Sequence, residues 1–310
     1  MLDYKLLEAF EAVIREGGFD KAAGTIHLTQ SAVSQRIKLL ESQMGQVLLI
    51  RTTPPKPTQA GRRLLKHYLQ VKQLENDVIQ DMTPSSKRNL IPLTIALNED
   101  SLATWFPPCI APFLATHPVV MDLRVDDQEQ THQFLSDGDV VGCISSRAKI
   151  VQGCSVSFLG AMIYRLVATP KFVKRWFARG LDRDSLEKAP AVIFNRRDEL
   201  HATMLSQLFK GDSFHIPSHY VPSPEQFAWI IVSGFGYGML PDQQALEMLH
   251  DGRLVDLCPN EHVKVNLYWH RWNILSPIID SLSKCLEQGA GKFLRENNLE
   301  FSKNPLSVLH

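Results

Sequence analysis

The sequence predicts a multidomain protein with an all-α N-terminal unit that carries a small wing, a long linker helix, and a two-lobed α/β body. Three observations lead to this fold class. At 310 residues, the chain exceeds the usual capacity of one hydrophobic core. Its first 90 residues carry helical periodicity interrupted by one short apolar run. Beyond them, short apolar runs alternate with helical segments, an order typical of parallel sheets whose strands are joined by helical crossovers.

The composition is that of an ordinary globular protein and excludes several classes. Apolar residues make up 44% and charged residues 21%, which excludes a disordered or collagen-like chain. The longest nearly apolar run, residues 227–240, is shorter than the ~20 residues of a membrane-spanning helix and contains three glycines. Charged residues near the N-terminus interrupt any signal-peptide core. We therefore expect a cytoplasmic protein with no membrane partner.

Neither the cysteines nor the histidines form a pattern suited to catalysis or metal binding. The five cysteines are an odd number without Cys-x-x-Cys spacing, which favours reduced structural thiols over a redox-sensing pair. Pro217 separates His215 from His219 and argues against a helix that aims both at one metal. The Gly-x-Gly-x-Gly run at residues 234–238 follows a predicted helix and enters a strand, which favours a helix C-cap over a nucleotide-binding loop. Since no catalytic motif occurs either, the sequence predicts no enzyme, no metal and no cofactor.

Charge is unevenly distributed, although the formal net charge is zero. Residues 17–72 hold nine Lys and Arg against two Asp and Glu, whereas residues 91–310 hold twenty against twenty-four. Lys and Arg that neutralise phosphates supply most of the non-specific affinity for DNA. The N-terminal segment is therefore suited to double-stranded DNA, and the mildly acidic body is not.

Three helices are expected in residues 1–44. The first has an apolar stripe and a glycine end, formed by Leu2, Leu6, Phe10, Val13 and Gly17. Asp20 is placed to cap a short second helix over residues 21–26. Thr29 is placed to cap the third helix.

The third helix has an apolar side and a hydrogen-bonding side. Val33, Ile37 and Leu40 share one face. The opposite face is polar and free of bulk, with Gln30, Ser31, Ser34, Gln35 and Lys38. Gln can pair with an adenine edge, Ser with a base or a phosphate, and Lys with a phosphate. Two short helices joined by a tight turn, the second with such a face, are typical of a helix-turn-helix, although an ordinary solvated helix in a small bundle has the same pattern.

A wing is expected to follow these helices. Residues 47–51 form a short apolar run that ends in Arg51 and predicts a strand, and residues 52–57 form a proline-rich turn that contains Lys56. The tip of such a wing can place Arg or Lys against a minor groove, which favours a winged helix-turn-helix over a plain bundle. The candidate DNA-contacting residues are Gln30, Ser31, Ser34, Gln35, Arg36, Lys38, Arg51 and Lys56.

A long helix is predicted after the wing. No proline occurs in residues 58–82, and apolar residues recur every three or four positions. The stripe consists of Leu64, Tyr68, Val71, Leu74, Val78 and Met82. A helix this long gains stability when its stripe meets a partner, so we expect a homodimer. Residues 83–87 are typical of a hinge.

The rest of the chain is predicted to form two small α/β lobes. Apolar runs suited to strands lie at residues 93–97, 119–125, 140–144, 163–169, 191–194, 236–240, 254–257 and 265–269. A long helix is expected over residues 278–294, and the chain is expected to cross between lobes near residues 165 and 266. We therefore divide the chain into a DNA-binding domain (1–58), a linker (59–90), lobe I (91–165 and 266–300), lobe II (166–265) and a tail (301–310).

Polar residues follow several of these strands, at the edge where open α/β sheets bind ligands. The candidate effector-binding residues are Asp100, Ser101, Thr104, Asp126, Asp127, Ser145 and Asn195. Ser101 and Thr104 are expected to open the helix of Trp105, where free backbone N–H groups favour an α-carboxylate. The acids can accept an α-ammonium or a cationic side chain. Each residue is equally suited to a solvated loop or a cap, and their convergence favours a site for a basic amino acid.

One pattern of forty residues is more specific than a generic helix-turn-helix. It consists of Ala22-Ala23, Thr29-Gln30-Ser31-Ala32-Val33-Ser34, Ile37, Leu40-Glu41, Gly45, Leu48, Arg51 and Pro57-Thr58-Gln59-Ala60-Gly61. The pattern resembles the N-terminal signature of LysR-type transcriptional regulators, with Leu48-Leu49-Ile50 where the family usually has Leu-Phe. The resemblance implies a periplasmic-binding-protein-like effector domain, dimerisation through the linker helix, assembly to a homotetramer, and action on RNA polymerase.

Further runs occur at Ile14-Arg15-Glu16, Gly45-Gln46, Leu48-Leu49, Arg51-Thr52, Pro54-Pro55, Asp100-Ser101-Leu102-Ala103-Thr104-Trp105 and Leu267-Tyr268-Trp269-His270-Arg271. They resemble the ArgP/LysG subgroup of arginine- and lysine-responsive regulators. This resemblance implies a regulator of amino-acid transport or metabolism genes whose small-molecule effector is L-lysine or L-arginine. Two alternatives stay open: a ligand-insensitive DNA-organising or replication-origin-binding protein, and an α/β enzyme with a DNA-binding appendage.

Overall fold

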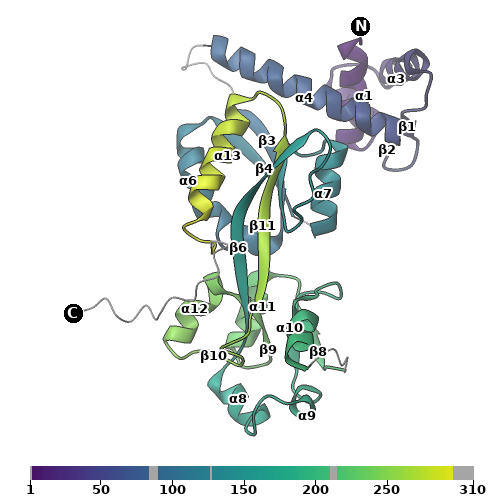
Figure 1. Ribbon diagram of the computed structural model, residues 1–310. Coiled ribbons are helices and arrows are strands. Elements are labelled where there is room, and N and C mark those ends of the chain that lie inside the picture. Colours follow the sequence, from purple (N-terminus) through teal and green to yellow (C-terminus); the bar gives the residue numbers. More distant parts are fainter. Residues whose placement is uncertain (1, 84–89, 126–127, 210–214, 296–310) are drawn as a thin grey trace.

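The computed structural model describes residues 2–83, 90–125, 128–209 and 215–295. Figure 1 shows a helical N-terminal domain and a long helix, α4 (Gln59–Met82), that lies across the first lobe of the body. Two long strands, β6 (Cys154–Ala168) and β11 (Val263–Trp272), run from the first lobe into the second. These parts confirm the predicted fold class.

The N-terminal domain consists of three helices and a two-stranded wing. Its elements are α1 (Tyr4–Glu16), α2 (Phe19–Thr25), α3 (Gln30–Met44), β1 (Leu49–Ile50) and β2 (Lys56–Pro57). Asp3 caps α1 because its side chain accepts a hydrogen bond from the Lys5 amide (2.9 Å), and left-handed Gly17 (φ 68°) ends the helix. Thr29 caps α3 as predicted, since its hydroxyl accepts a hydrogen bond from the Ala32 amide (3.2 Å).

The second helix begins earlier than the sequence predicts. It starts at Phe19, and Gly18 is its N-cap residue. The prediction that Asp20 caps this helix is therefore wrong. Asp20 lies inside the first turn, where a negative charge still interacts favourably with the positive end of the helix dipole.

The linker helix α4 has a buried end and an exposed end. Thr58 caps it by accepting a hydrogen bond from the Gly61 amide (3.1 Å). Near this end, Tyr68 packs into the core of the N-terminal domain. At the other end, Val78 and Met82 are 57% and 82% exposed. An exposed apolar stripe at the end of a long helix is suited to a partner helix.

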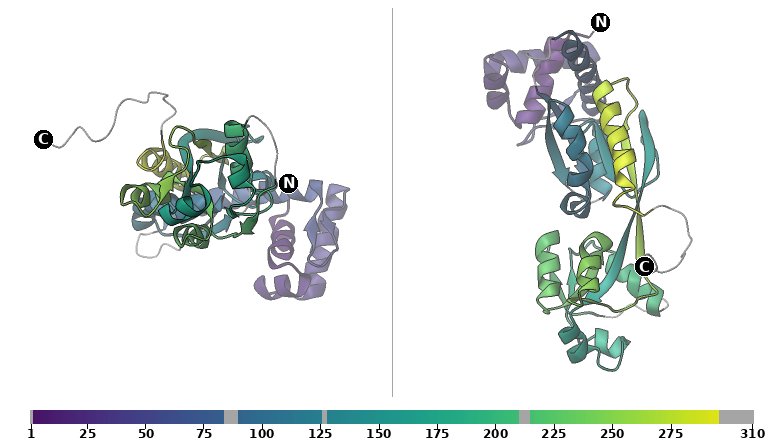
Figure 2. Two further views of the ribbon diagram at one scale, coloured as in Figure 1. Left: turned by 90° about the horizontal axis from the view of Figure 1, so that it is seen from below. Right: turned by 90° about the vertical axis from the view of Figure 1, so that its left-hand side faces the viewer.

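In the described residues, one nine-stranded sheet runs through both lobes. Its other strands are β3 (Ile91–Leu97), β4 (Val119–Val125), β5 (Gly142–Ser145), β7 (Ala191–Ile193), β8 (Ser218–Tyr220), β9 (Tyr237–Pro241) and β10 (Val255–Asp256). The order is β4-β3-β5-β11-β6-β9-β7-β8, with β10 beside β6. Strands β6 and β11 pair antiparallel, and the register shifts between Leu267 and Tyr268, opposite Gly160. Figure 2 shows this pair of strands running between the two lobes.

Helices pack around the sheet in both lobes. Lobe I contains α5 (Glu99–Ala103), α6 (Phe106–Thr116), α7 (Gln128–Asp137) and α13 (Pro277–Ala290). Lobe II contains α8 (Pro170–Trp176), α9 (Arg183–Leu186), α10 (Leu200–Phe209), α11 (Pro224–Val232) and α12 (Asp242–His250). Figure 1 shows α6 and α13 on one side of the lobe I strands and α7 on the other.

The sheet is mixed rather than parallel. The predicted helical crossovers do produce parallel pairs, β3 with β4 and β5, and β7 with β8 and β9. The long antiparallel pairing of β6 with β11 was not predicted, because it joins segments that are far apart in the sequence. The glycine run behaves as predicted, since Gly234 (φ 80°) ends α11 and the chain then enters β9.

Candidate nucleic-acid interface and inter-lobe polar cluster

The outer face of α3 is open to solvent. Gln30, Ser31, Gln35 and Lys38 are exposed, and Ser34 is half-buried. They share one side of the helix because of their spacing. They present amide, hydroxyl and ammonium groups without apolar bulk, a set suited to base edges and phosphates. The structure thus brings these predicted DNA contacts together, and their role in DNA binding stays a prediction.

Arg36 and the wing residues are placed apart from this face. Arg36 lies on another side of α3, where its Nη1 donates to the Lys5 carbonyl (3.3 Å). This hydrogen bond ties α3 to α1, so the structure does not group Arg36 with the outer face. Arg51 and Lys56 are exposed on the wing.

Glu41 positions the wing, a role that the sequence analysis did not assign to it. Its Oε1 accepts hydrogen bonds from the amides of Leu48 (2.9 Å) and Leu49 (3.2 Å). Just after β2, the hydroxyl of Thr58, the N-cap residue of α4, donates to the Val47 carbonyl (2.9 Å). These bonds set the direction of the wing relative to α3. The available signal was an isolated acid in a basic segment, just before a predicted strand.

Asp100 of lobe I, Tyr164 of β6 and Asp198 of lobe II lie close enough for the charge of Asp198 to act on the other two, and we call these three residues the inter-lobe polar cluster. Asp100 of α5 accepts a hydrogen bond from the Tyr164 hydroxyl of β6 (2.7 Å). Burial raises the pKa of Asp100, the hydroxyl of Tyr164 lowers it in part, and the negative charge of Asp198 raises it further. Among the described residues, no Lys or Arg forms an ion pair with Asp100 or Asp198. The pair is therefore suited to a cation that a ligand supplies.

Ser101 and Thr104 do not open the helix of Trp105, so that part of the prediction is wrong. Ser101 lies inside α5, and its buried Oγ accepts a hydrogen bond from Trp105 Nε1 (2.9 Å). Thr104 ends α5, and its hydroxyl donates to the Asp100 carbonyl. The helical pattern concealed a break, because a separate helix, α6, begins at Phe106.

Ser145 and Asn195 lie at strand ends, where the sequence places them. Ser145 is buried at the end of β5, and its Oγ accepts a hydrogen bond from the Arg147 amide (3.2 Å). Asn195 is half-buried after β7, and its Oδ1 accepts a hydrogen bond from the Arg197 amide (2.7 Å). Both side chains stabilise local turns, and their contact with an effector stays a prediction.

Two of the predicted acidic effector contacts cannot be placed, and one acidic residue that was not predicted lies near Asp100. Asp126 and Asp127 lie outside the described residues. Asp198, which sequence reasoning missed, accepts hydrogen bonds from the amides of Leu200 (2.9 Å) and Phe194 (3.2 Å). These bonds hold the start of α10 against the end of β7. An acid between a predicted strand and a helical run was the signal that could have found it.

A cavity of about 450 Å³ lies on the face of β6 opposite to the inter-lobe polar cluster. Residues of both lobes line it, among them Thr104, Gln243 and Lys292. Because side chains alternate along a strand, Ile163 faces this cavity while Tyr164 faces Asp100. Thr104 therefore borders a space that is separate from the inter-lobe polar cluster.

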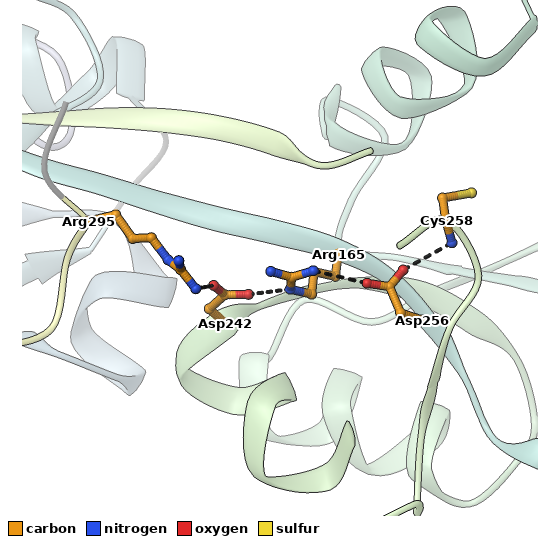
Figure 3. Close-up of polar contacts among 5 residues, drawn as sticks. All are labelled: Arg165, Asp242, Asp256, Cys258 and Arg295. Carbon is orange, nitrogen blue, oxygen red and sulfur yellow. Dashed lines mark hydrogen bonds and ion pairs between the residues drawn. The ribbon is translucent and has the colours of Figure 1, made fainter. Parts of the chain in front are cut away.

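A chain of ion pairs joins the two lobes beside this cavity (Figure 3). Buried Asp242, at the start of α12, accepts hydrogen bonds from Arg165 Nε (2.6 Å) and Arg295 Nη2 (2.8 Å). Arg165 also pairs with Asp256 (3.1 Å), which in turn accepts a hydrogen bond from the Cys258 amide (2.9 Å). Because Arg295 follows α13 of lobe I, Asp242 ties the lobes together.

Acid is expected to destabilise the body through buried histidines. Burial lowers the pKa of His201 to about 4, and burial together with the charges of His270 and Arg147 lowers the pKa of His132 to about 4. The unfolded chain takes up these protons below about pH 6.5, so it binds more protons than the folded chain between pH 6.5 and 4. Stability therefore falls as the pH falls through this window.

The variant His201→Gln cannot take up this proton. In urea unfolding experiments, we expect it to lose less stability than the wild type when the pH is lowered from about 6.5 to about 4.5. An equal loss in the two proteins would rule out His201 as a source of the acid sensitivity.

The described residues offer little for metal, membrane or thiol chemistry. No group of three or more potential ligands is arranged there to hold a metal ion. None of their helices is both long enough and apolar enough to cross a bilayer. Burial raises the pKa of Cys109 and of Cys258 to about 11, so both thiols stay protonated and unreactive at neutral pH.

Known proteins match the chain over both of its parts. Residues 4–62 match the profile of the bacterial regulatory helix-turn-helix protein, lysR family, and residues 92–291 match that of the LysR substrate binding domain. The HTH-type transcriptional regulator ArgP of Aeromonas salmonicida is 43% identical over 271 residues, which cover 87% of this chain and 91% of that protein. ArgP of Pseudomonas aeruginosa is 43% identical over 294 residues, which cover 94% of this chain and 97% of that protein.

Two solved structures share both the fold and much of the sequence. The crystal structure of ArgP from Mycobacterium tuberculosis is 38% identical, with a TM-score of 0.86 over 96% of this chain and 100% of that chain. Full-length LysG from Corynebacterium glutamicum with bound effector Arg is 33% identical, with a TM-score of 0.78 over 95% of this chain and 100% of that chain. The chain therefore belongs to the LysR family of bacterial transcriptional regulators, in the branch that contains ArgP and LysG.

Proposed function

We propose that this regulator senses a basic amino acid, L-arginine or L-lysine, and controls genes of amino-acid transport or metabolism. The observation that carries the proposal is that no described Lys or Arg pairs with Asp100 of lobe I, while the charge of Asp198 from lobe II acts on it. A guanidinium or ammonium group placed between them would neutralise both charges and hold the lobes together. The bound arginine of the related LysG supports this ligand class.

Isothermal titration calorimetry tests the proposal directly. We expect heat from L-arginine or L-lysine and none from L-citrulline, which has nearly the shape of arginine but no charge. Asp100→Asn should weaken binding roughly 10- to 100-fold, because a hydrogen-bonded charge pair is lost. Asp122→Asn is the matched control, since this acid is largely exposed on β4 and should not change the affinity. Equal heats from citrulline, or an unchanged affinity of Asp100→Asn, would contradict the proposal.

Lys56 of the wing is proposed to contact a phosphate. We expect Lys56→Ala to weaken binding to specific and non-specific duplexes by a similar factor. The slope of log affinity against log salt should become shallower by about one unit, because one fewer counterion is released. Fluorescence anisotropy at several salt concentrations measures both effects, and an unchanged slope would remove Lys56 from the phosphate contacts.

The regulator is further proposed to work in the cytoplasm as a homodimer that assembles into a homotetramer. The exposed apolar end of α4, with Val78 and Met82, supports the dimer. Ligand binding would change the relative placement of the paired DNA-binding domains and thereby the recruitment of RNA polymerase. DNA binding that no basic amino acid alters would instead favour a DNA-organising or replication-origin-binding protein.

A further inference from the structure

The linker helix α4 packs directly on lobe I of its own chain. The backbone at Gly138 (φ 88°), just after α7, lies so close to α4 that an added Cβ would be 2.7 Å from the Lys66 Cα. Lys66 Nζ donates to the Gln152 carbonyl of lobe I (3.3 Å). Leu69 packs against both the core of the N-terminal domain and the core of the body. The helix is therefore held by both parts of the molecule.

Arg62 of α4 extends this contact to the wing. Its Nε pairs with Asp137, the last residue of α7 (3.1 Å), and its Nη1 donates to the Pro57 carbonyl in β2 (3.1 Å). Gln133, one turn earlier in α7, donates to the other oxygen of Asp137 (2.9 Å). One planar guanidinium thus contacts lobe I and the wing at the same time.

Other contacts of α7 lead away from the wing, toward the inter-lobe region. His132 of α7 packs against the ring of His270 in β11, with 4.5 Å between the ring centres. His270 Nε2 donates to the Arg147 carbonyl (2.7 Å), and the Arg147 amide donates to Ser145 at the end of β5 (3.2 Å). A continuous series of contacts therefore runs from the end of β5, where Ser145 lies opposite Tyr268 at the register shift of the β6–β11 pair, to the base of the wing.

We propose that α7 transmits movement of the inter-lobe region to the wing, with Arg62 and Asp137 as positioning residues at the wing end. The helix is suited to this because Thr131 and Leu135 anchor it to the body as fully buried side chains. A shift of the end of β5 would move α7, and the wing would follow because Arg62 connects α7 to it. This inference rests on the proposed function only in assuming that a ligand binds between the lobes.

Hydrogen exchange tests the link without any ligand. Asp137→Asn removes the charge that Arg62 pairs with, far from the outer face of α3. We expect amides of the wing, residues 47–58, to exchange several-fold faster in this variant, because the wing loses its tie to lobe I. Asp122→Asn is the matched control, since its pair with Arg124 (3.5 Å) stays within lobe I. Wing exchange equal to that of the wild type in Asp137→Asn would overturn the proposal.

A second measurement asks whether the link carries the effector signal. L-arginine is added to wild type and Asp137→Asn, and the DNA affinity of each is measured with and without it. We expect the factor by which arginine changes this affinity to fall to near one in Asp137→Asn, while calorimetry without DNA shows unchanged arginine binding. If arginine changes the DNA affinity of Asp137→Asn by the same factor as that of the wild type, the proposal is overturned. If the wild type itself does not bind arginine, the proposed function fails, and hydrogen exchange alone decides the link.

Discussion

Replacing Ser34 with glutamate is expected to lower the affinity for specific DNA by about 100-fold or more, equivalent to about 2.7 kcal/mol. Ser34 lies in the middle of the polar outer face of α3. If this face enters the major groove, the new carboxylate meets phosphates and base acceptors, which repel it. The affinity can be measured by gel shift with a duplex that the wild-type protein selects from a random library.

Gln43→Glu is the control for this variant. It adds the same charge to the same helix, at an exposed position on the side opposite Ser34. We expect it to bind the selected duplex within a few-fold of the wild type. Wild-type affinity in Ser34→Glu would mean that the outer face of α3 does not contact DNA.

The largest loss of stability is expected from Asp242→Asn. The buried carboxylate of Asp242 accepts hydrogen bonds from Arg165 and Arg295, and the amide cannot neutralise their charges. Removing one partner from a buried ion pair typically costs 3–5 kcal/mol. Because Arg165 keeps its pair with Asp256, we expect a loss of about 2–4 kcal/mol in the free energy of unfolding. Urea denaturation followed by tryptophan fluorescence measures it.

Asp251→Asn provides the comparison for Asp242→Asn. Asp251 also pairs with an arginine, Arg253 (2.7 Å), but on the surface of the same lobe. Exposed pairs contribute little, so we expect no measurable change. Equal stabilities of the two variants would show that the pairs of Asp242 contribute no more than a surface pair.

Features determined by neighbouring residues could be predicted from the sequence. Thr29 caps α3 because its hydroxyl needs only an amide three residues away. The outer face of α3 follows from helical spacing, and the end of α11 follows from the backbone freedom of Gly234. Asp20 failed as a predicted cap because the helix begins at Phe19, with Gly18 as its N-cap residue.

Features determined by distant residues could not be predicted in this way. The pairing of β6 with β11 and the contact of Arg62 with Asp137 depend on how the lobes and the linker pack. The inter-lobe polar cluster was predicted in part, since Asp100 was a candidate and Asp198 was not. Ser101 was misplaced because its hydroxyl bonds to Trp105 inside the lobe, a contact that spacing alone does not reveal.

The paired strands β6 and β11, which both lobes share, limit how the two lobes can move. Backbone hydrogen bonds hold the two strands together along their length, so the lobes can change their relative angle by bending of this strand pair without breaking these bonds. The irregularity opposite Gly160, where φ is 136° and an added Cβ would lie 2.6 Å from the Leu294 Cβ, concentrates bending at one level. If an amino acid binds between the lobes as proposed, its effect should therefore be a hinge rotation of one lobe against the other at this level, while β6 and β11 stay paired.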